Sequence, residues 1–270
     1  ANGDPALWAS GVEQNGHQLS NGTQADIADT PLGVELGDID GDSHLDVLVG
    51  ARNEVPRLFL NRLEQNGGVL TTFIDITYGA MTNFASGGDN YEQEFGDMDN
   101  DNDLDIYGLN WAAPPGSPDI TTPNDGTGHF AAWTVLSGSN SDDNEGDWFD
   151  YNNDGDLDLF VTNFGGQDRL YENNGSPGYG LTNVTSTQFV NENKIGLGSD
   201  SCDVDNDGDY DLMVGNDNFT ANELWINITQ TPDTHAPRVV VEQAPNQTGT
   251  SNPTRIRAKV YDNASWDVIR

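Results

Sequence analysis

The chain has 270 residues and carries 45 Asp and Glu against 10 Lys and Arg, which gives a net charge of −35 at pH 7. A protein of this charge without a basic stripe repels phosphate groups, so we expect no nucleic-acid partner. No apolar run approaches the ~18 residues of a membrane span, and the single cysteine, Cys202, has no partner for an intramolecular disulfide.

Residues 1–32 precede a repetitive region, and we expect them to help close the array of sheets that follows. Residues 33–229 contain the same nine-residue acidic frame four times. The frames begin at Asp38, Asp97, Asp150 and Asp203, at intervals of 59, 53 and 53 residues. A period of this length indicates a propeller, a solenoid or another array of supersecondary units. The four repeats are called units one to four below.

Each frame alternates oxygen-bearing side chains with other residues. Side-chain oxygens at positions one, three and five, a backbone carbonyl at position seven and a carboxylate at position nine can supply the six to eight oxygens that Ca²⁺ accepts. No His or Cys pair offers a softer metal a site. The sequence therefore predicts about four Ca²⁺ ions, held by Asp38, Asp40, Asp42, His44 and Asp46; by Asp97, Asp99, Asp101, Asp103 and Asp105; by Asp150, Asn152, Asp154, Asp156 and Asp158; and by Asp203, Asp205, Asp207, Asp209 and Asp211.

The four frames are unequal at position six, where the loop turns sharply. Glycine tolerates a positive φ best, and this position holds Gly155 and Gly208 in the last two units but Asn102 in unit two and Ser43 in unit one. Site one is therefore expected to be the least well organised. A further acid precedes each frame by three residues, either as a rim group or as a direct ligand: Glu35, Glu94, Asp147 and Asp200.

The segments around the frames read as strands, which predicts an all-β fold. A β-rich run follows each frame, at residues 45–49, 104–107, 157–161 and 210–214. A second strand is expected at residues 57–61, 169–173 and 223–227, and a last one at residues 73–77, 130–134 and 181–185. Unit two departs from the pattern, because residues 110–118 are a Pro-rich insertion that cannot be an interior strand. With the strand before the frame, each unit has about four strands, like one propeller blade.

The frame between two strands, followed by a strand that ends in Asn, resembles the FG-GAP/VCBS repeats of integrin-type β-propellers and bacterial surface proteins. EF-hand loops share the first five positions, but they place the bidentate acid at position twelve and are flanked by helices. The resemblance implies a β-propeller-like array of four four-stranded blades with calcium loops, in which the acid at position nine is bidentate.

The C-terminal part differs in kind. Residues 230–237 are a Thr/Pro linker, and residues 238–270 form an arm with strand patterns at 238–242 and 254–261. Its start resembles the first strand of bacterial immunoglobulin-like domains, which need about 100 residues and seven strands, so another element has to complete it. Residues 231–270 carry a net charge of +1 and residues 1–230 one of −36. The arm is therefore expected either to fold back on its own acidic body or to link copies head to tail by donating strands.

These features predict a secreted, calcium-stabilised structural or adhesive protein at a cell surface, assembled into a filament by the arm. Calcium is abundant outside the cell, and no catalytic signature is present, so we expect no enzyme activity. The alternatives are a lectin-like propeller, with Trp111 or Tyr179 as the aromatic platform for a glycan, and a non-catalytic fragment of a polysaccharide-acting enzyme. Seven N-glycosylation sequons occur, at Asn21, Asn174, Asn183, Asn218, Asn227, Asn246 and Asn263.

Overall fold

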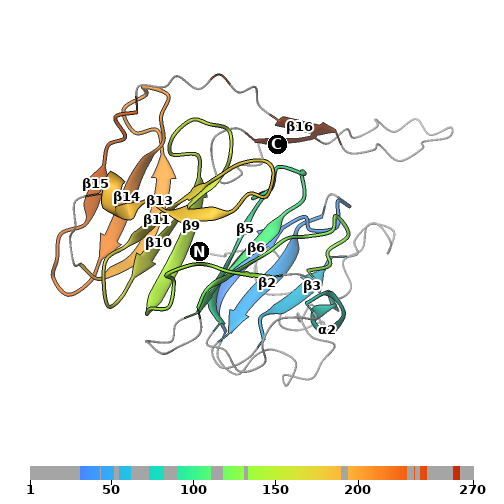
Figure 1. Ribbon diagram of the computed structural model, residues 1–270. Helices are drawn as coiled ribbons and strands as arrows, with labels where there is room; N and C mark the ends of the chain where they lie inside the picture. The colour runs from blue at the N-terminus through green and yellow to red at the C-terminus, as the bar shows by residue number, and fades with distance from the viewer. Residues whose placement is uncertain are drawn as a thin grey trace, which may run out of the picture.

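The computed structural model describes residues 31–42, 44–51, 55–61, 73–81, 90–110, 118–130, 133–189, 194–229, 234, 238–241 and 258–261. Within these ranges the regular structure is β-strand apart from two four-residue helices, α2 (Thr77–Ala80) and α3 (Thr185–Gln188) (Figure 1). None of the described helices is long and apolar enough to cross a membrane. The prediction of an all-β fold is confirmed for the described residues.

Each predicted unit forms an antiparallel sheet in which the strand before the frame pairs with the strand after it. In sequence order the strands are β1 (Pro31–Gly37), β2 (Asp46–Ala51), β3 (Arg57–Leu60) and β4 (Ile74–Asp75) in unit one; β5 (Asn90–Gly96), β6 (Asp105–Asn110), β7 (Ile120–Thr122) and β8 (Thr134–Val135) in unit two; β9 (Asp143–Phe149), β10 (Asp158–Asn163), β11 (Arg169–Asn173) and β12 (Leu181–Asn183) in unit three; and β13 (Gly196–Cys202), β14 (Asp211–Asn216) and β15 (Glu223–Trp225) in unit four. Three units thus have four described strands, and unit four has three.

The sheets follow one another with their first strands side by side. Strand β1 contacts β5, β5 contacts β9, and β9 contacts β13. Ala51 and Asn90 also form one bridge between β2 and β5, so that units one and two share a single hydrogen-bonded sheet. The array is therefore blade-like, and a closed ring is not described.

Three apolar clusters fill the spaces between successive units. The first lies between units one and two, the second between two and three, and the third between three and four. Strand β10 is buried on both faces, because Leu159 packs towards unit two whereas Phe160 packs towards unit four. Burial on both faces explains why the strands after the frames read as continuous apolar runs rather than alternating ones.

Two glycines permit the close approach of the first strands to their neighbours. A Cβ atom on Gly37 would lie 2.6 Å from Leu104 Cδ1, and one on Gly96 would lie 2.9 Å from Trp148 Cδ1. Both glycines immediately precede a frame. Larger side chains at these two positions would push adjacent units apart at the point where the frames begin.

Unit two departs from the pattern as expected, since its third strand, β7, starts only after the Pro-rich segment. Residues 111–117, including the proposed sugar platform Trp111, lie outside the described residues. The arm contains a hairpin in which β16 (Arg238–Val241) pairs with β17 (Ala258–Tyr261). Both strands fall within the predicted segments, but residues 254–257 and the rest of the arm are not described, so its docking is untested.

Candidate metal centres

The four frames form the loops that connect the first and second strands of each unit. The acid at position nine is the first residue of the second strand and is almost completely buried in every unit: Asp46, Asp105, Asp158 and Asp211. The first acid is buried in units one to three, at Asp38, Asp97 and Asp150. The alternating side chains of each frame therefore project from a loop whose two ends are fixed in the sheet.

Three of the four loops bring carboxylates together. Within each set, one carboxylate oxygen of every residue lies within 4.8 Å of those of the others, in Asp38, Asp40 and Asp42; in Asp97, Asp99 and Asp101; and in Asp203, Asp205 and Asp211. Unit three has Asn152 at position three, so it contributes an amide oxygen there instead of a third carboxylate. The Oδ1 atom of Asp99 is buried and has no hydrogen-bond partner in the structure, which is consistent with a metal-ligand role for this atom.

Backbone amides hold the loops in shape. In every unit the amide of position five donates to Oδ1 of position one, over 3.0 Å to Asp38 and Asp97, 3.1 Å to Asp150 and 3.2 Å to Asp203. The amide of position seven donates in the same way to Oδ1 of position five, at 3.0–3.1 Å. The backbone thus orients the carboxylates of positions one and five.

The sharp turns in the loops occur at two positions. At position six φ is +77° at Asn102, +87° at Gly155 and +99° at Gly208, as predicted, whereas Ser43 lies outside the described residues. Position four also has a positive φ in every unit, at Gly41, Asn100, Asn153 and Asn206. Asparagine tolerates the left-handed region better than other residues with a Cβ, so this second turn explains why Asn or Gly recurs at position four.

In units one to three the acids at position nine have strongly raised pKa values. Burial raises the pKa of Asp46 to about 7, of Asp105 to about 8 and of Asp158 to about 9, although backbone hydrogen bonds oppose the effect. One carboxylate oxygen accepts the amide of position two and the other accepts the amide of an asparagine at or just after the end of the third strand. The ionised form of such a buried acid requires a positive charge nearby.

In units three and four the side chain at position seven accepts a hydrogen bond from the preceding unit, whereas in unit one it contacts position five of its own frame. Asn100 of unit two donates to Asp156 of unit three, and Asn153 of unit three donates to Asp209 Oδ1 of unit four at 2.5 Å. In unit one the Nδ1 atom of His44 lies 3.0 Å from Asp42 Oδ1. These contacts agree with a frame in which position seven offers its backbone carbonyl, as the resemblance implies.

Four asparagines at or just after the end of the third strand were not identified as site residues from the sequence: Asn61, Asn124, Asn173 and Asn227. In each, the backbone amide donates to the acid at position nine at 2.7–2.8 Å, and the side-chain amide donates to the carbonyl just before that acid's strand. In the last three, the side chain also reaches the position-two carbonyl of the preceding unit, at Ile39, Met98 and Tyr151, over 2.9, 2.8 and 2.7 Å. We call these residues the asparagine clasps.

The acids that precede the frames by three residues lie on the first strands of their sheets, outside the three carboxylate clusters. Glu94 is joined there by Glu92 of its own strand and Glu145 of the next, and burial together with the neighbouring carboxylates raises the pKa of Glu92 to about 8. Burial also raises the pKa of Asp147 to about 7. Glu35, Glu94 and Asp147 are half-buried and Asp200 is exposed, and none of the four lies in a described carboxylate cluster.

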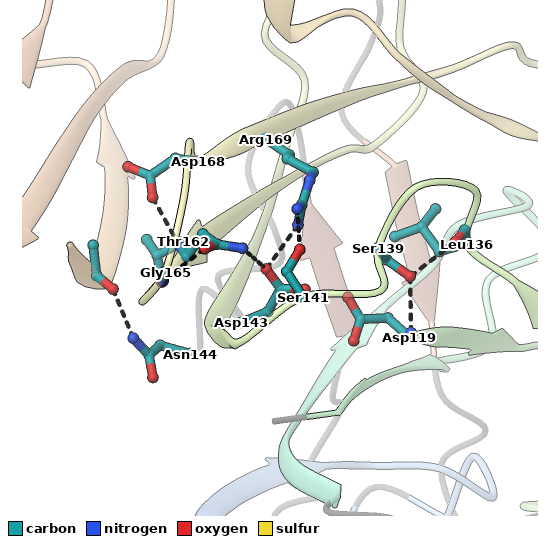
Figure 2. Close-up of polar contacts among 12 residues, drawn as sticks. Asp119, Leu136, Ser139, Ser141, Asp143, Asn144, Thr162, Gly165, Asp168 and Arg169 are labelled. Carbon is teal, nitrogen blue, oxygen red and sulfur yellow. Dashed lines mark hydrogen bonds and ion pairs between the residues drawn. The ribbon is translucent and has the colours of Figure 1, made fainter. Parts of the chain in front are cut away.

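A second polar network joins units two and three (Figure 2). Asp119, just after the Pro-rich segment, accepts hydrogen bonds from the Tyr107 hydroxyl and the Asn110 amide, each at 2.8 Å. Its own amide donates to Ser139. Arg169 donates to Asp143 Oδ1 at 2.7 Å. Burial and the neighbouring Asp143 hold the pKa of Asp119 well above its usual range. Asp119 and Asp143 are fully buried and Arg169 is half-buried, so the network has the features of a structural contact between units two and three.

Comparison with known proteins agrees with this geometry in part. Among solved structures, the crystal structure of the V. cholerae biofilm matrix protein Bap1 matches 68% of this chain with 18% identity and a TM-score of 0.36, and the match covers 28% of that chain. No curated protein matches the chain. The immunoglobulin-like resemblance of the arm is not confirmed. The sequence profile of the FG-GAP-like repeat family matches residues 150–214, from the first acid of frame three into the strand after frame four, so this part of the chain is an FG-GAP-like repeat.

Proposed function

We propose that the chain is a calcium-stabilised extracellular structural or adhesive protein that binds one Ca²⁺ in each of its four loops. The observation that carries the proposal is the set of carboxylate clusters, in which three acids within 4.8 Å of one another are fixed by backbone hydrogen bonds. Oxygen-only ligands of this number suit a hard cation with flexible coordination, which favours Ca²⁺ over Zn²⁺.

Within each loop, the side chains at positions one, three and five and the acid at position nine hold the ion, and position seven adds its carbonyl. The bound ion supplies positive charge that offsets the mutual repulsion of the acids. Loops of this kind in extracellular modules bind calcium in the millimolar to submillimolar range, and a chain of net charge −35 gains the most from such ions where they are abundant.

The arm is proposed to link copies head to tail. Two features support this role: an isolated two-stranded hairpin is marginally stable, and residues 231–270 have a net charge of +1 against −36 for the body. Truncation after Thr231 tests it, because the full chain is expected to form polymers that grow with protein concentration and the truncated chain is not. Equal sedimentation of both across a wide concentration range would show that the arm is not a linker.

Calcium binding is tested directly by isothermal titration of chelator-stripped protein. We expect about four Ca²⁺ per chain, and one fewer for Asp205→Asn. The matched control is Asp217→Asn, which removes an exposed acid outside the frames and should leave the stoichiometry unchanged. Absence of binding at millimolar Ca²⁺, or equal losses in both variants, would contradict the proposal.

A further inference from the structure

The residue at position seven of frames three and four is fixed at two of the three groups that its Cα atom carries. In frame three the amide of Asp156 donates to the position-five carboxylate of its own frame at 3.0 Å, and the side chain of Asp156 accepts a hydrogen bond from Asn100 of frame two. In frame four the amide of Asp209 donates in the same way at 3.1 Å, and its side chain accepts from Asn153 of frame three at 2.5 Å. The third group is the carbonyl that is proposed to bind the ion.

Fixing the amide and the side chain restricts the direction of this carbonyl. Because the three groups share one Cα atom, the carbonyl can still move only by rotation about ψ. Position nine, two residues further on, is the first residue of the second strand in both units, which limits that rotation as well. A ligand whose orientation is already restricted loses less conformational freedom when it binds, and affinity rises accordingly.

The position-seven carboxylates of frames two and three also lie against a glycine of their own unit. A Cβ atom on Gly126 would lie 2.5 Å from Asp103 Oδ2, and one on Gly175 would lie 2.5 Å from Asp156 Oδ2. The amide of each glycine donates to the side chain of the asparagine clasp of its unit, at 3.2 and 3.1 Å. Asp156 is therefore held by contacts from its own unit and from the preceding frame.

The donor from the preceding frame stands at position four, in the turn between the ligands at positions three and five. Asn100 and Asn153 have φ values of +62° and +60°, and Asn153 is 3% exposed. Frame one has Gly41 at this position, which has no side chain to donate. Asn206 of frame four has the same turn, with φ of +63°, but its residue is exposed and no later frame is present among the described residues. The contact thus runs from frame two to frame three and from frame three to frame four.

We propose that Asn100 and Asn153 are positioning residues that align the metal-binding carbonyl of the following frame, so that sites three and four owe part of their calcium affinity to the frame before them. This inference rests on the proposed calcium binding and adds to it the dependence of one site on a side chain from another. A hydrogen bond to a charged acceptor is stronger than one between neutral groups. Loss of the donor is therefore expected to raise the dissociation constant of the following site by about tenfold.

The test is calcium titration of the full chain against a competing chromophoric chelator. Asn100→Gly removes the donor and keeps a residue that tolerates a positive φ, and we expect one dissociation constant to rise while the stoichiometry stays the same. The rise should persist when site two is removed by Asp101→Asn, and it should vanish when site three is removed by Asp154→Asn. Asn100→Asp keeps the size of the side chain but places a second carboxylate against Asp156, so it should weaken the site at least as much.

The matched control is Asn206→Gly, the same change at the same position and a similar φ, which should leave every dissociation constant unchanged. An equal rise in this control, or a rise in Asn100→Gly that vanishes with Asp101→Asn, would show that position four serves its own loop and would overturn the proposal. Unchanged constants in Asn100→Gly and Asn100→Asp, in a chain that binds calcium, would overturn it and leave the proposed function intact. Absence of calcium binding by the parent chain would overturn both.

Discussion

Removal of calcium should lower the stability of this protein by an amount that the geometry of the loops allows us to estimate. In units one and two, three carboxylates lie within 4.8 Å of one another. Two unit charges at that separation repel by about 0.9 kcal/mol even in water, so three pairs contribute about 2.6 kcal/mol per loop and two loops about 5 kcal/mol. This is a large fraction of the roughly 5–15 kcal/mol by which a domain is stable.

The assay is thermal unfolding monitored by circular dichroism, first in about 2 mM CaCl₂ and then in excess EGTA at the same pH and salt concentration. For a chain of this size, each 1 kcal/mol shifts the melting temperature by roughly 2–4 °C, so we expect a fall of about 10–20 °C. Excess Ca²⁺ should restore the original value and an equal concentration of Mg²⁺ should not. A shift of less than about 2 °C would show that the frames are acidic loops without a structural ion.

Three further predictions follow from individual residues. At saturating calcium, Asp205→Ala should cost more stability than Asp40→Ala if a glycine at position six organises the site, and equal or reversed losses in calcium-titrated unfolding would contradict this ranking. Asn173→Ala should destabilise by about 1–3 kcal/mol in urea unfolding, because a buried carbonyl of the neighbouring unit loses its donor, whereas Asn174→Ala, at an exposed position, should cost less. Burial raises the pKa of Glu92 from 4.5 to about 8. Between these two pH values the folded protein keeps a proton that the unfolded chain has already lost, so the free energy of unfolding falls as the pH rises. Glu92→Gln should therefore raise the melting temperature at pH 8 but not at pH 4, and equal shifts at both pH values would show that Glu92 is not protonated in the folded state.

Local sequence patterns are sufficient to predict much of the fold. The frames and the strands beside them could be located from the sequence, because the turn residues, the alternating acids and the apolar runs all act over fewer than ten residues. Position six is an example: a sharp turn was predicted there from Gly155 and Gly208, and φ is positive at both. The second turn, at position four, was not predicted, since asparagine also occurs in polar loops at positions without a positive φ.

Contacts between units were beyond the reach of sequence patterns. Asn124 stands 85 residues from Ile39 in the chain, yet its side chain donates to the Ile39 carbonyl. The Pro-rich segment shifts the third strand of unit two, so Asn124 did not align with the asparagines of the other units. Asp119 was also not identified as a site residue, because it follows the same Pro-rich segment and has no counterpart at that position in the other units. No local spacing indicates that a side chain in one repeat will pair with the backbone of the previous one.

Three of the asparagine clasps connect the frames of units one to three to the next unit through a single peptide group. In unit two, the Met98 amide donates to Asp105 at 2.9 Å, and the Met98 carbonyl accepts from Asn173 of unit three at 2.8 Å. A cation that draws Asp105 inwards therefore acts on a residue whose other side is fixed to unit three. Since the backbone amide of Asn173 in turn donates to Asp158 of its own loop at 2.7 Å, the two loops are joined by a continuous run of hydrogen bonds.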